Sequence, residues 1–176
     1  MRLITSLDQH ELGLLESSDS NISYTRRAAR AVMINGKRQV AVMHFTGTGS
    51  YKLPGGGIDD GESVEEALRR EVREETGYEI VAIQELGVVE EDRYFCGMHQ
   101  TSYCFVAEAG RFVGAELTEK EAVEGMELVW VDSIEQAIKS VNSGSVVYEG
   151  TSLAGLEMMK LRDVAILRTA KGAISE

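Results

Sequence analysis

The chain has 176 residues, of which 43% are hydrophobic and 27% charged, and its formal net charge at pH 7 is −11. This composition is typical of a globular protein that buries a substantial core, and it argues against an extended disordered region. The acidic excess argues against a general nucleic-acid surface, because basic patches hold phosphate backbones. A small anionic substrate is still compatible with it, since divalent cations can bridge acidic side chains and phosphate oxygens.

The cysteines and the N-terminus indicate the cellular compartment. Cys96 and Cys104 lie in no spacing typical of zinc, and two thiols do not make a secreted disulfide framework. The first residues lack the long apolar segment of a secretory signal. No stretch approaches the ~18–20 apolar residues of a membrane span. We therefore expect a cytoplasmic protein without a membrane or nucleic-acid partner.

The N-terminal part of the chain predicts an extension followed by a β-hairpin. Residues 1–24 are mixed and polar, and they could form a peripheral strand or turn packed on the core, or part of a dimer contact. Residues 29–34 and 39–45 are β-rich runs separated by Asn35-Gly36, a strong hairpin signal. The glycine pair of the next loop, Gly47 and Gly49, lacks the third glycine of a dinucleotide fingerprint. It predicts an ordinary loop that could form one wall of a site.

Residues 53–78 carry the strongest local pattern. A turn with three consecutive glycines, at positions 55–57, precedes a predicted helix from Ser63 to Thr76. Ser63 and Glu66 form a capping box, and Gly77 lies where a left-handed C-terminal cap is expected. Both ends of this helix are therefore predicted from local residues.

Three glutamates on this helix share its apolar face or border it. Glu71 and Glu75 fall within the stripe, and Glu74 lies at its edge. The sequence offers Glu71 and Glu75 no cation at helical spacing, and unpaired carboxylates turned towards a core would be costly. Carboxylates gathered in this way suit Mg²⁺ or Mn²⁺. The alternative is a solvated polar helix with arginines nearby.

The rest of the chain predicts further strands and two helices. Strands are expected at 79–90, 100–107 and 127–131, with a charged turn at 90–93, a strand start at 94–95 and a polar loop at 116–125. Ser133 caps a helix at 134–141, and a last helix spans about 152–170. Interleaved strands and helices with hairpins among them predict a mixed sheet covered by helices.

One spacing resembles a known family signature. The pattern consists of Gly56, five residues, Glu62, seven residues, Arg70-Glu71-Val72, one residue, Glu74-Glu75, one residue and Gly77-Tyr78. It is similar to the Nudix box of the Nudix hydrolases, and it departs from that box only in having a tyrosine at the final apolar position. The surrounding strand pattern extends the resemblance to roughly residues 26–141. The resemblance implies an α/β (α+β) fold, a Nudix-type mixed β-sheet sandwiched between helices, with an added C-terminal helix. It also implies one domain over 1–176 with its core at about 25–145.

The resemblance implies an activity and a set of site residues. Nudix enzymes use divalent metal to hydrolyse the diphosphate bond of a nucleoside diphosphate linked to another moiety, as in a nucleoside triphosphate, dinucleoside polyphosphate or nucleotide sugar. Mg²⁺ (or Mn²⁺) would be held by Glu71, Glu74, Glu75 and the carbonyl of Gly56. A later acidic residue, shortly before a strand that bears a tryptophan, would act as a further ligand or as the base. Glu124, six residues before Trp130, is preferred and Glu121 is next. Weaker candidates for that role are Glu90, Glu91 and Asp92.

Other residues are expected to support this site. Glu62 and Arg70 would tie the loop to the helix, and Gly77 would be a further structural residue of the box. His44 and His99 are not expected to act in the site. The candidate substrate contacts are Arg30, Lys52, Gly55 and Tyr94. Tyr94 lies at the distance from the box that is associated with dinucleoside polyphosphate hydrolases, but a tyrosine in the core or at a strand edge is the simpler interpretation.

Three function classes remain open from the sequence. The first is the metal-dependent hydrolase of nucleotides or their derivatives. The second is a non-catalytic Nudix-fold binding or regulatory protein, although such proteins usually lose box glutamates that this chain keeps. The third, a prenyl-diphosphate isomerase, relies on cysteine and histidine patterns that are not found here. The subfamily markers of ADP-ribose, NADH and coenzyme A hydrolases are also missing, and a homodimer is possible.

Overall fold

A mixed sheet of seven strands forms the framework of the computed structural model, which describes residues 1–144 and 152–174. The strands are β1 (Leu3–Asp8), β2 (Tyr24–Ile34), β3 (Val40–Phe45), β4 (Ser50–Lys52), β5 (Tyr78–Arg93), β6 (Met98–Phe112) and β7 (Met126–Val131). Their order is β1-β5-β6-β2-β3-β4, with β7 also paired to β3. Strand β2 therefore lies in the middle of the sheet, and it supplies the central wall of the site described below.

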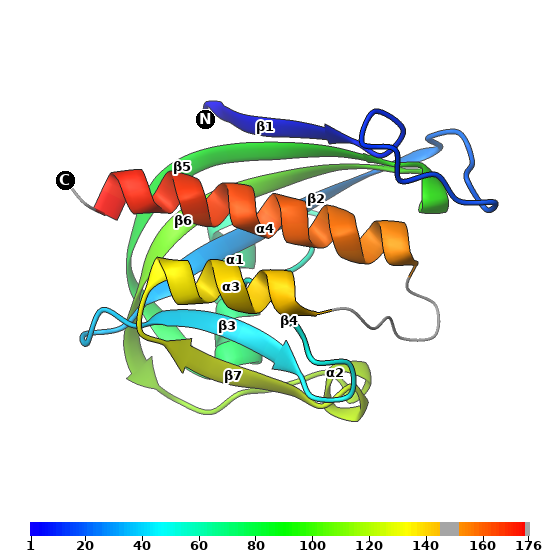
Figure 1. The fold of residues 1–176 in the computed structure, drawn as a ribbon. Coiled ribbons are helices and arrows are strands. Elements are labelled where there is room, and N and C mark those ends of the chain that lie inside the picture. Colours follow the sequence, from blue (N-terminus) through cyan, green and yellow to red (C-terminus); the bar gives the residue numbers. More distant parts are fainter. Residues whose placement is uncertain (145–151, 175–176) are drawn as a thin grey trace.

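Strand directions confirm the predicted mixed sheet and hairpin. The β1–β5 and β2–β6 pairs are parallel, whereas β5–β6, β2–β3, β3–β4 and β3–β7 are antiparallel. The Asn35-Gly36 turn joins β2 to β3, and the Asn35 side chain accepts hydrogen bonds from the N–H groups of Lys37 and Gln39. Only Ile34 and Val40 pair across this hairpin. Strand β3 consequently leaves β2 at once and turns towards β4 and β7 (Figure 1).

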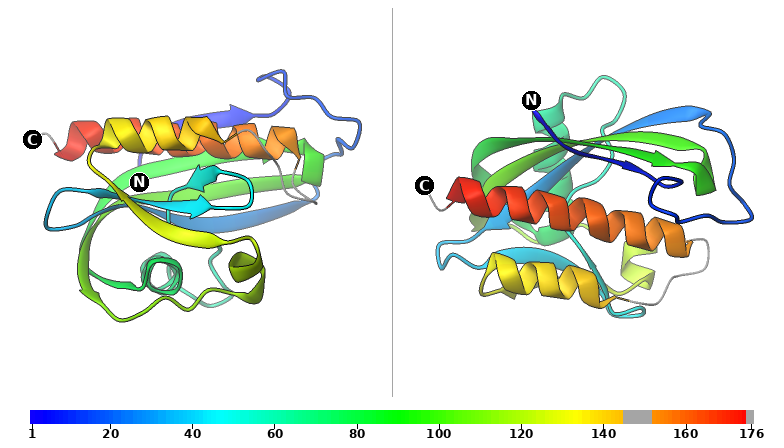
Figure 2. Two further views of the ribbon diagram at one scale, coloured as in Figure 1. Left: turned by 60° about the horizontal axis from the view of Figure 1, so that its bottom comes forward. Right: turned by 45° about the horizontal axis from the view of Figure 1, so that its top comes forward.

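Helices cover both faces of the sheet. They are α1 (Val64–Thr76), α2 (Glu119–Val123), α3 (Ile134–Ser143) and α4 (Leu153–Ile174), with a 3₁₀ turn η1 (Tyr94–Cys96). Figure 2 shows α3 and α4 side by side on one face of the sheet and α1 on the other. This arrangement confirms the predicted fold class, a mixed sheet sandwiched between helices with an added C-terminal helix.

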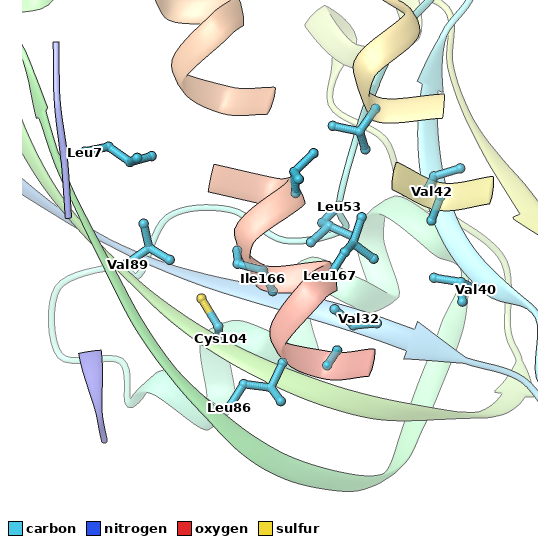
Figure 3. Packing of buried hydrophobic residues seen from close by; sticks show 14 of the residues in the cluster. Leu7, Val32, Val40, Val42, Leu53, Leu86, Val89, Cys104, Ile166 and Leu167 are labelled. Atoms are coloured by element: carbon cyan, nitrogen blue, oxygen red, sulfur yellow. The ribbon is translucent and has the colours of Figure 1, made fainter. Parts of the chain in front are cut away.

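The alternation of side chains along β2 builds two cores. Ala29, Ala31 and Met33 pack towards α1, together with Leu68 and Val72 of that helix. Val32 points to the opposite face, where Ile166 and Leu167 of α4 lie among strand side chains (Figure 3). Both α4 residues are fully buried, and burying each contributes about 1.5–3 kcal/mol. The sheet is therefore held from both sides, which fixes β2 between α1 and α4.

Several sequence-based expectations need correction. Residues 90–93, predicted as a charged turn, continue β5, and residues 94–95, predicted to start a strand, lie in η1. The polar loop at 116–125 contains the short helix α2. The predicted end of the core near residue 145 lies outside the described residues.

The N-terminal extension forms a strand at the edge of the sheet. Strand β1 pairs in parallel with residues 88–92 of β5, and the N–H of Gln9 donates to the carbonyl of Asp92 at 3.0 Å. This is one of the two arrangements left open by the sequence, the peripheral strand. Across the part of the chain that the structure describes, none of the helices is long and apolar enough to cross a membrane.

Candidate active site

Helix α1 begins and ends where the sequence predicts. The Ser63 side chain accepts from the N–H of Glu66, the Glu66 side chain accepts from the N–H of Ser63, and Gly77 adopts the left-handed conformation with φ 75°. A capping side chain of this kind contributes ~1 kcal/mol. The local sequence thus fixes where the glutamates of the helix stand.

The turn at 54–57 is fastened to β2 by its backbone. The N–H of Ala31 donates to the carbonyl of Pro54 at 3.0 Å, and the N–H of Ala29 donates to the carbonyl of Gly56 at 2.9 Å. Gly55 has φ +125°, and a Cβ there would lie 2.2 Å from the Ala29 carbonyl oxygen. Only glycine fits this close approach, so the first glycine of the turn is required by the packing against β2.

Glu71 and Glu75 both pack against this turn. A Cβ on Gly56 would lie 2.2 Å from Glu71 Oε2, so the carboxylate occupies the space that a side chain would fill. Glu75 is 3% exposed. Its two oxygens accept hydrogen bonds from Lys52 Nζ at 2.6 Å and from the N–H of Gly55 at 2.8 Å. Burial raises the pKa of Glu75, and the Lys52 ammonium opposes that shift.

Arg70 lies at the centre of a network of charged groups. Its guanidinium donates to both oxygens of Glu62, at 2.9 and 2.8 Å, and to the carbonyl of Gly57 at 3.0 Å. The predicted tie between loop and helix is therefore present. The same group also reaches Glu71 at 2.8 Å and Glu74 at 3.2 Å. The hydrogen bond from Arg70 lowers the pKa of Glu62 below its usual value.

These contacts correct one expectation from the sequence. Glu71 was expected to find no cation on its own helix, but Arg70 next to it in the chain curls back to reach it. Glu75 likewise meets Lys52 from β4, a residue 23 positions earlier. Helical spacing alone does not predict either contact. Arg70 and Lys52 have long, flexible side chains, and both contacts depend on how these side chains fold over the turn at 54–57.

The box residues line a cavity of about 410 Å³. Its walls come from β2, β4, the glycine turn, α1 and the start of α2. The lining residues are Arg26, Arg30, Lys52, Gly55, Gly56, Gly57, Arg70, Glu71, Glu74, Glu75, Thr118 and Glu121. A larger cavity of about 790 Å³ lies near the β2–β3 turn and the end of α4. We assign the site to the smaller cavity because its lining combines carboxylates, cations and the glycine turn.

Of the later acidic residues, Glu121 lines this cavity and Glu124 does not. Thr118 and Glu121 form a capping box, in which Glu121 Oε2 accepts from the Thr118 N–H at 2.9 Å and from its hydroxyl at 2.8 Å. Glu124 ends the same short helix, with a carboxylate oxygen 3.8 Å from Lys120 Nζ. Glu121 therefore lies at the cavity and Glu124 outside its lining, and the role of either residue stays a prediction.

The candidate substrate contacts divide into two groups. Arg30 and Lys52 line the cavity, and the N–H of Gly55 is engaged by Glu75. Tyr94 lies outside the cavity lining: its hydroxyl donates to Asp8 at 3.1 Å and its ring stacks on His10 with centroids 3.9 Å apart. Arg26 also lines the cavity and was not predicted, although its spacing of four from Arg30 places both on one face of β2.

The donor set fits a divalent cation by its chemistry. Among residues 1–144 and 152–174, no three Asp, Glu, His or Cys side chains converge in a ready-made metal-binding group. Arg70 and Lys52 instead form ion pairs with the three glutamates in this arrangement. Carboxylate oxygens are nevertheless the ligands that Mg²⁺ and Mn²⁺ prefer. These residues fit such an ion once it replaces the two side chains as the partner of the carboxylates.

Comparisons with known sequences point to one family. The sequence model of the NUDIX domain matches residues 24–147. A Bacillus subtilis (strain 168) protein named for 8-oxo-dGTP diphosphatase activity is 35% identical over 71 residues, which cover 40% of this chain and 47% of that protein. Nucleoside triphosphatase NudI of Salmonella schwarzengrund (strain CVM19633) is 58% identical over 33 residues, covering 19% of this chain and 23% of NudI. The chain thus aligns with less than half the length of each of these two relatives.

Solved structures share the fold. A NUDIX hydrolase from Nitrosomonas europaea superposes with a TM-score of 0.57 at 19% identity, covering 79% of this chain and 87% of that chain. The crystal structure of an ADP compounds hydrolase superposes with a TM-score of 0.57 at 22% identity, covering 85% of this chain and 73% of that chain. At these identities, the likeness concerns the fold alone.

Proposed function

This chain belongs to the Nudix family, and we propose that it hydrolyses a diphosphate bond in a nucleoside diphosphate derivative with the help of a divalent metal. The observation that carries the proposal is that Glu71, Glu74 and Glu75 all line one cavity beside the glycine turn. Lys52 and Arg30 line the same cavity. One site therefore offers carboxylates to a cation and cations to phosphate oxygens.

The three box glutamates and the carbonyl of Gly56 would hold Mg²⁺ (or Mn²⁺). The Gly56 carbonyl already accepts from Ala29, and its second lone pair is available to a further partner. When bound, the ion neutralises phosphate oxygens and makes a bound water more acidic. Lys52 and Arg30 orient the phosphate groups by charge-assisted hydrogen bonds. Gly55 acts indirectly, since its N–H holds Glu75 in place.

Glu121 is our candidate for orienting and deprotonating the attacking water. It lines the cavity, and its capping contacts with Thr118 hold the carboxylate in position. Glu121→Gln should therefore lower kcat more than Glu124→Gln, and pH profiles of the two variants check the assignment. A larger loss in Glu124→Gln would return the role to that residue.

The names of the two curated relatives favour one substrate class. One is named for 8-oxo-dGTP diphosphatase activity and the other is a nucleoside triphosphatase. We therefore propose a nucleoside triphosphate as the substrate, ahead of a dinucleoside polyphosphate or a nucleotide sugar. A panel containing all three classes, assayed for phosphate and pyrophosphate release with and without Mg²⁺, tests this order.

Glu71→Gln tests the site. The substitution keeps the shape of the side chain and removes one charged ligand. Since changes in the outer shell of a metal site already cost ~10–100-fold, we expect kcat/KM to fall by at least about 100-fold. Glu65→Gln is the matched control, because Glu65 lies on the same helix, is exposed and pairs with the exposed Arg69. Release of neither phosphate nor pyrophosphate from any substrate would instead indicate a binding protein.

A further inference from the structure

A second cavity of about 280 Å³ adjoins the active-site cavity and shares three cationic residues with it. Arg26, Arg30 and Lys52 line both cavities. The other lining residues of the second cavity are Arg93, Phe95, Cys96, Gly155, Met159 and Arg162. We call this second cavity the arginine chamber. In a chain with a formal net charge of −11, five cationic side chains around one small cavity need an explanation.

The strand pattern explains how the arginines converge. Arg26 and Arg30 lie four residues apart on β2, on the same face as Val32, and this face turns towards α4. Arg93 comes from the end of β5, and Arg162 comes from α4 itself. The apolar interface between α4 and the sheet therefore becomes a cationic chamber near the start of the helix.

Two of the arginines are matched by carboxylates. The guanidinium of Arg93 contacts Glu91, and Arg162 Nε donates to Asp163 at 2.7 Å. Arg162 also lies 3.8 Å from Glu91. Both carboxylates are fully buried. Together these four side chains form a neutral set on one side of the chamber.

Arg26 and Arg30 have a different set of partners. Arg26 Nη1 donates to the amide oxygen of Gln100 at 2.7 Å, and Arg30 Nη1 donates to the carbonyl of Gly55. Both acceptors are neutral, and no carboxylate among the described residues forms an ion pair with either arginine. Two positive charges at the boundary of the two cavities therefore lack an ion-pair partner among the described residues. More distant carboxylates still favour their charged forms, Glu71 and Glu91 for Arg26 and Asp163 and Glu75 for Arg30.

The burial of Arg30 makes this arrangement unfavourable in free energy. It is 5% exposed, and its Nε has no hydrogen-bond partner among the described residues. A buried donor without a partner costs roughly 1–3 kcal/mol. Burial lowers the pKa of Arg30 to about 10, and the positive charge of Arg162 contributes to this shift. An anion bound between Arg26 and Arg30 would supply both the missing counter-charge and the missing acceptor.

We propose that the arginine chamber is an anion subsite that binds a further phosphate group of the substrate, beyond the diphosphate hydrolysed beside Glu71. Its volume lies below the ~300–1,000 Å³ of pockets that take whole ligands, so it suits one phosphate and the carbon atoms next to it. Phe95 and Met159 offer an apolar wall for those carbon atoms. The proposal rests on the hydrolase function proposed above, and two kinds of phosphate satisfy it: the next group of a linear chain, or a separate monoester.

Phosphate binding without metal tests the chamber by itself. Inorganic phosphate is titrated calorimetrically into metal-free protein, comparing the wild type with Met159→Glu, which places a carboxylate in the chamber wall. Leu161→Glu is the control, because it adds the same charge to the same helix at an exposed position outside the chamber lining. We expect Met159→Glu to weaken binding by at least about 10-fold and Leu161→Glu to have little effect.

A second variant covers the arginines themselves. Arg26→Gln removes one of the two unmatched charges from a half-buried position, and we expect a loss of roughly 10- to 100-fold in phosphate affinity. Arg111→Gln removes the same charge from an exposed site that pairs with Glu79, and it should bind phosphate as the wild type does. Equal effects of Arg26→Gln and Arg111→Gln, or no phosphate binding by the wild type, would overturn the proposal.

Kinetics with Mg²⁺ distinguish the two sources of phosphate. Diadenosine tetraphosphate is compared with diadenosine diphosphate for the linear chain, and coenzyme A with dephospho-coenzyme A for the monoester. Met159→Glu should lower the preference for the more highly phosphorylated member of one pair by about 10-fold, mainly through KM. Hydrolysis with both preferences unchanged would refute the subsite. Phosphate binding that Met159→Glu abolishes, without hydrolysis of any substrate, would keep the subsite and overturn the hydrolase function.

Discussion

Asp163 connects helix α4 to the turn of the candidate active site. This carboxylate is fully buried, and its Oδ2 accepts from the N–H of Leu53 at 2.9 Å. Its Oδ1 accepts from Arg162 Nε at 2.7 Å. Leu53 immediately precedes the turn at 54–57. We therefore expect Asp163→Asn to weaken both the packing of α4 and the placement of the glycine turn.

The magnitude follows from what asparagine keeps and what it loses. Asparagine preserves the shape and can still accept from Leu53, but it leaves Arg162 with only Glu91, at 3.8 Å, as a counter-charge. Breaking a buried ion pair from one side costs ~3–5 kcal/mol. Because one hydrogen bond and one distant carboxylate remain, we expect about 3 kcal/mol. A typical stability of ~5–15 kcal/mol leaves such a variant folded.

Urea unfolding followed by circular dichroism measures this loss, and steady-state kinetics on the folded fraction measure its effect on the site. We expect kcat/KM to fall about 10-fold, as for other residues that position a site without contacting its ligand. Asp132→Asn is the control, since Asp132 is exposed and accepts one hydrogen bond from Gln39. A loss of stability below about 0.5 kcal/mol would refute the reasoning about the buried pair. Unchanged kinetics in a destabilised variant would refute the link to the turn.

Three further predictions concern residues around the site and the sheet. Glu62→Gln removes the charge that receives two hydrogen bonds from Arg70, and we expect activity to fall by ~10–100-fold with little change in fold, measured against Glu65→Gln. The hydrogen bond with Asp92 raises the pKa of His99 above its ordinary value, with Glu90 contributing. The stability gained from protonated His99 is therefore present below about pH 6.5 and is lost as pH rises through the raised pKa. His99→Gln should accordingly be less stable than the wild type near pH 6 and should approach it near pH 9, and a ring titration by NMR with a midpoint below 6.5 would contradict this. Burial raises the pKa of Cys104 to about 12, so a thiol reagent near pH 8 should label only Cys96 in the native protein, and fast labelling of the Cys96→Ser variant would contradict the buried position of Cys104.

The sequence predicts helix α1 well because the determinants of that helix are local. Its caps, apolar stripe and glycine turn all lie within residues 53–78, so no distant contact was needed to place the three box glutamates. The Asn35-Gly36 hairpin was predictable for the same reason. Glu62 and Arg70 could be assigned a structural role from the family resemblance, and their hydrogen bonds agree with it.

Contacts between elements far apart in the chain could not be predicted from local sequence patterns. Residues 90–93 looked like a turn because they are all charged, yet they extend β5 under cover of β1 and α4. In α4, Leu156, Met158 and Leu167 are buried as expected for apolar side chains, but Arg162 and Asp163 are buried in the same helix. The burial of charged residues depends on partners such as Glu91, far away in the chain, and no local periodicity encodes that pairing.

The positions of Glu124 and Glu121 relative to the cavity cannot be predicted from their spacing to Trp130 along the chain. The distance to Trp130 favours Glu124, but the stretch between them begins with the short helix α2. Glu121, held by its capping contacts with Thr118, lines the cavity, whereas Glu124 ends the helix with a carboxylate oxygen 3.8 Å from Lys120 Nζ. The signal was present in the sequence, since Thr118 and Glu121 have the spacing of a capping box.

The charges of the two adjoining cavities determine how a substrate can lie. Around α1, the single guanidinium of Arg70 is shared by Glu62, Glu71 and Glu74. This end therefore carries an excess of negative charge, which favours binding of a cation. At the other end, the five cationic side chains around the arginine chamber outnumber the carboxylates paired with them, which are Glu75, Glu91 and Asp163. Lys52 lines both cavities while its ammonium is bound to Glu75. If the proposed function holds, a long anion that spans them would be oriented by these charges. The diphosphate to be cleaved would lie at the cation held by the glutamates, and the remaining negative charge would lie towards α4.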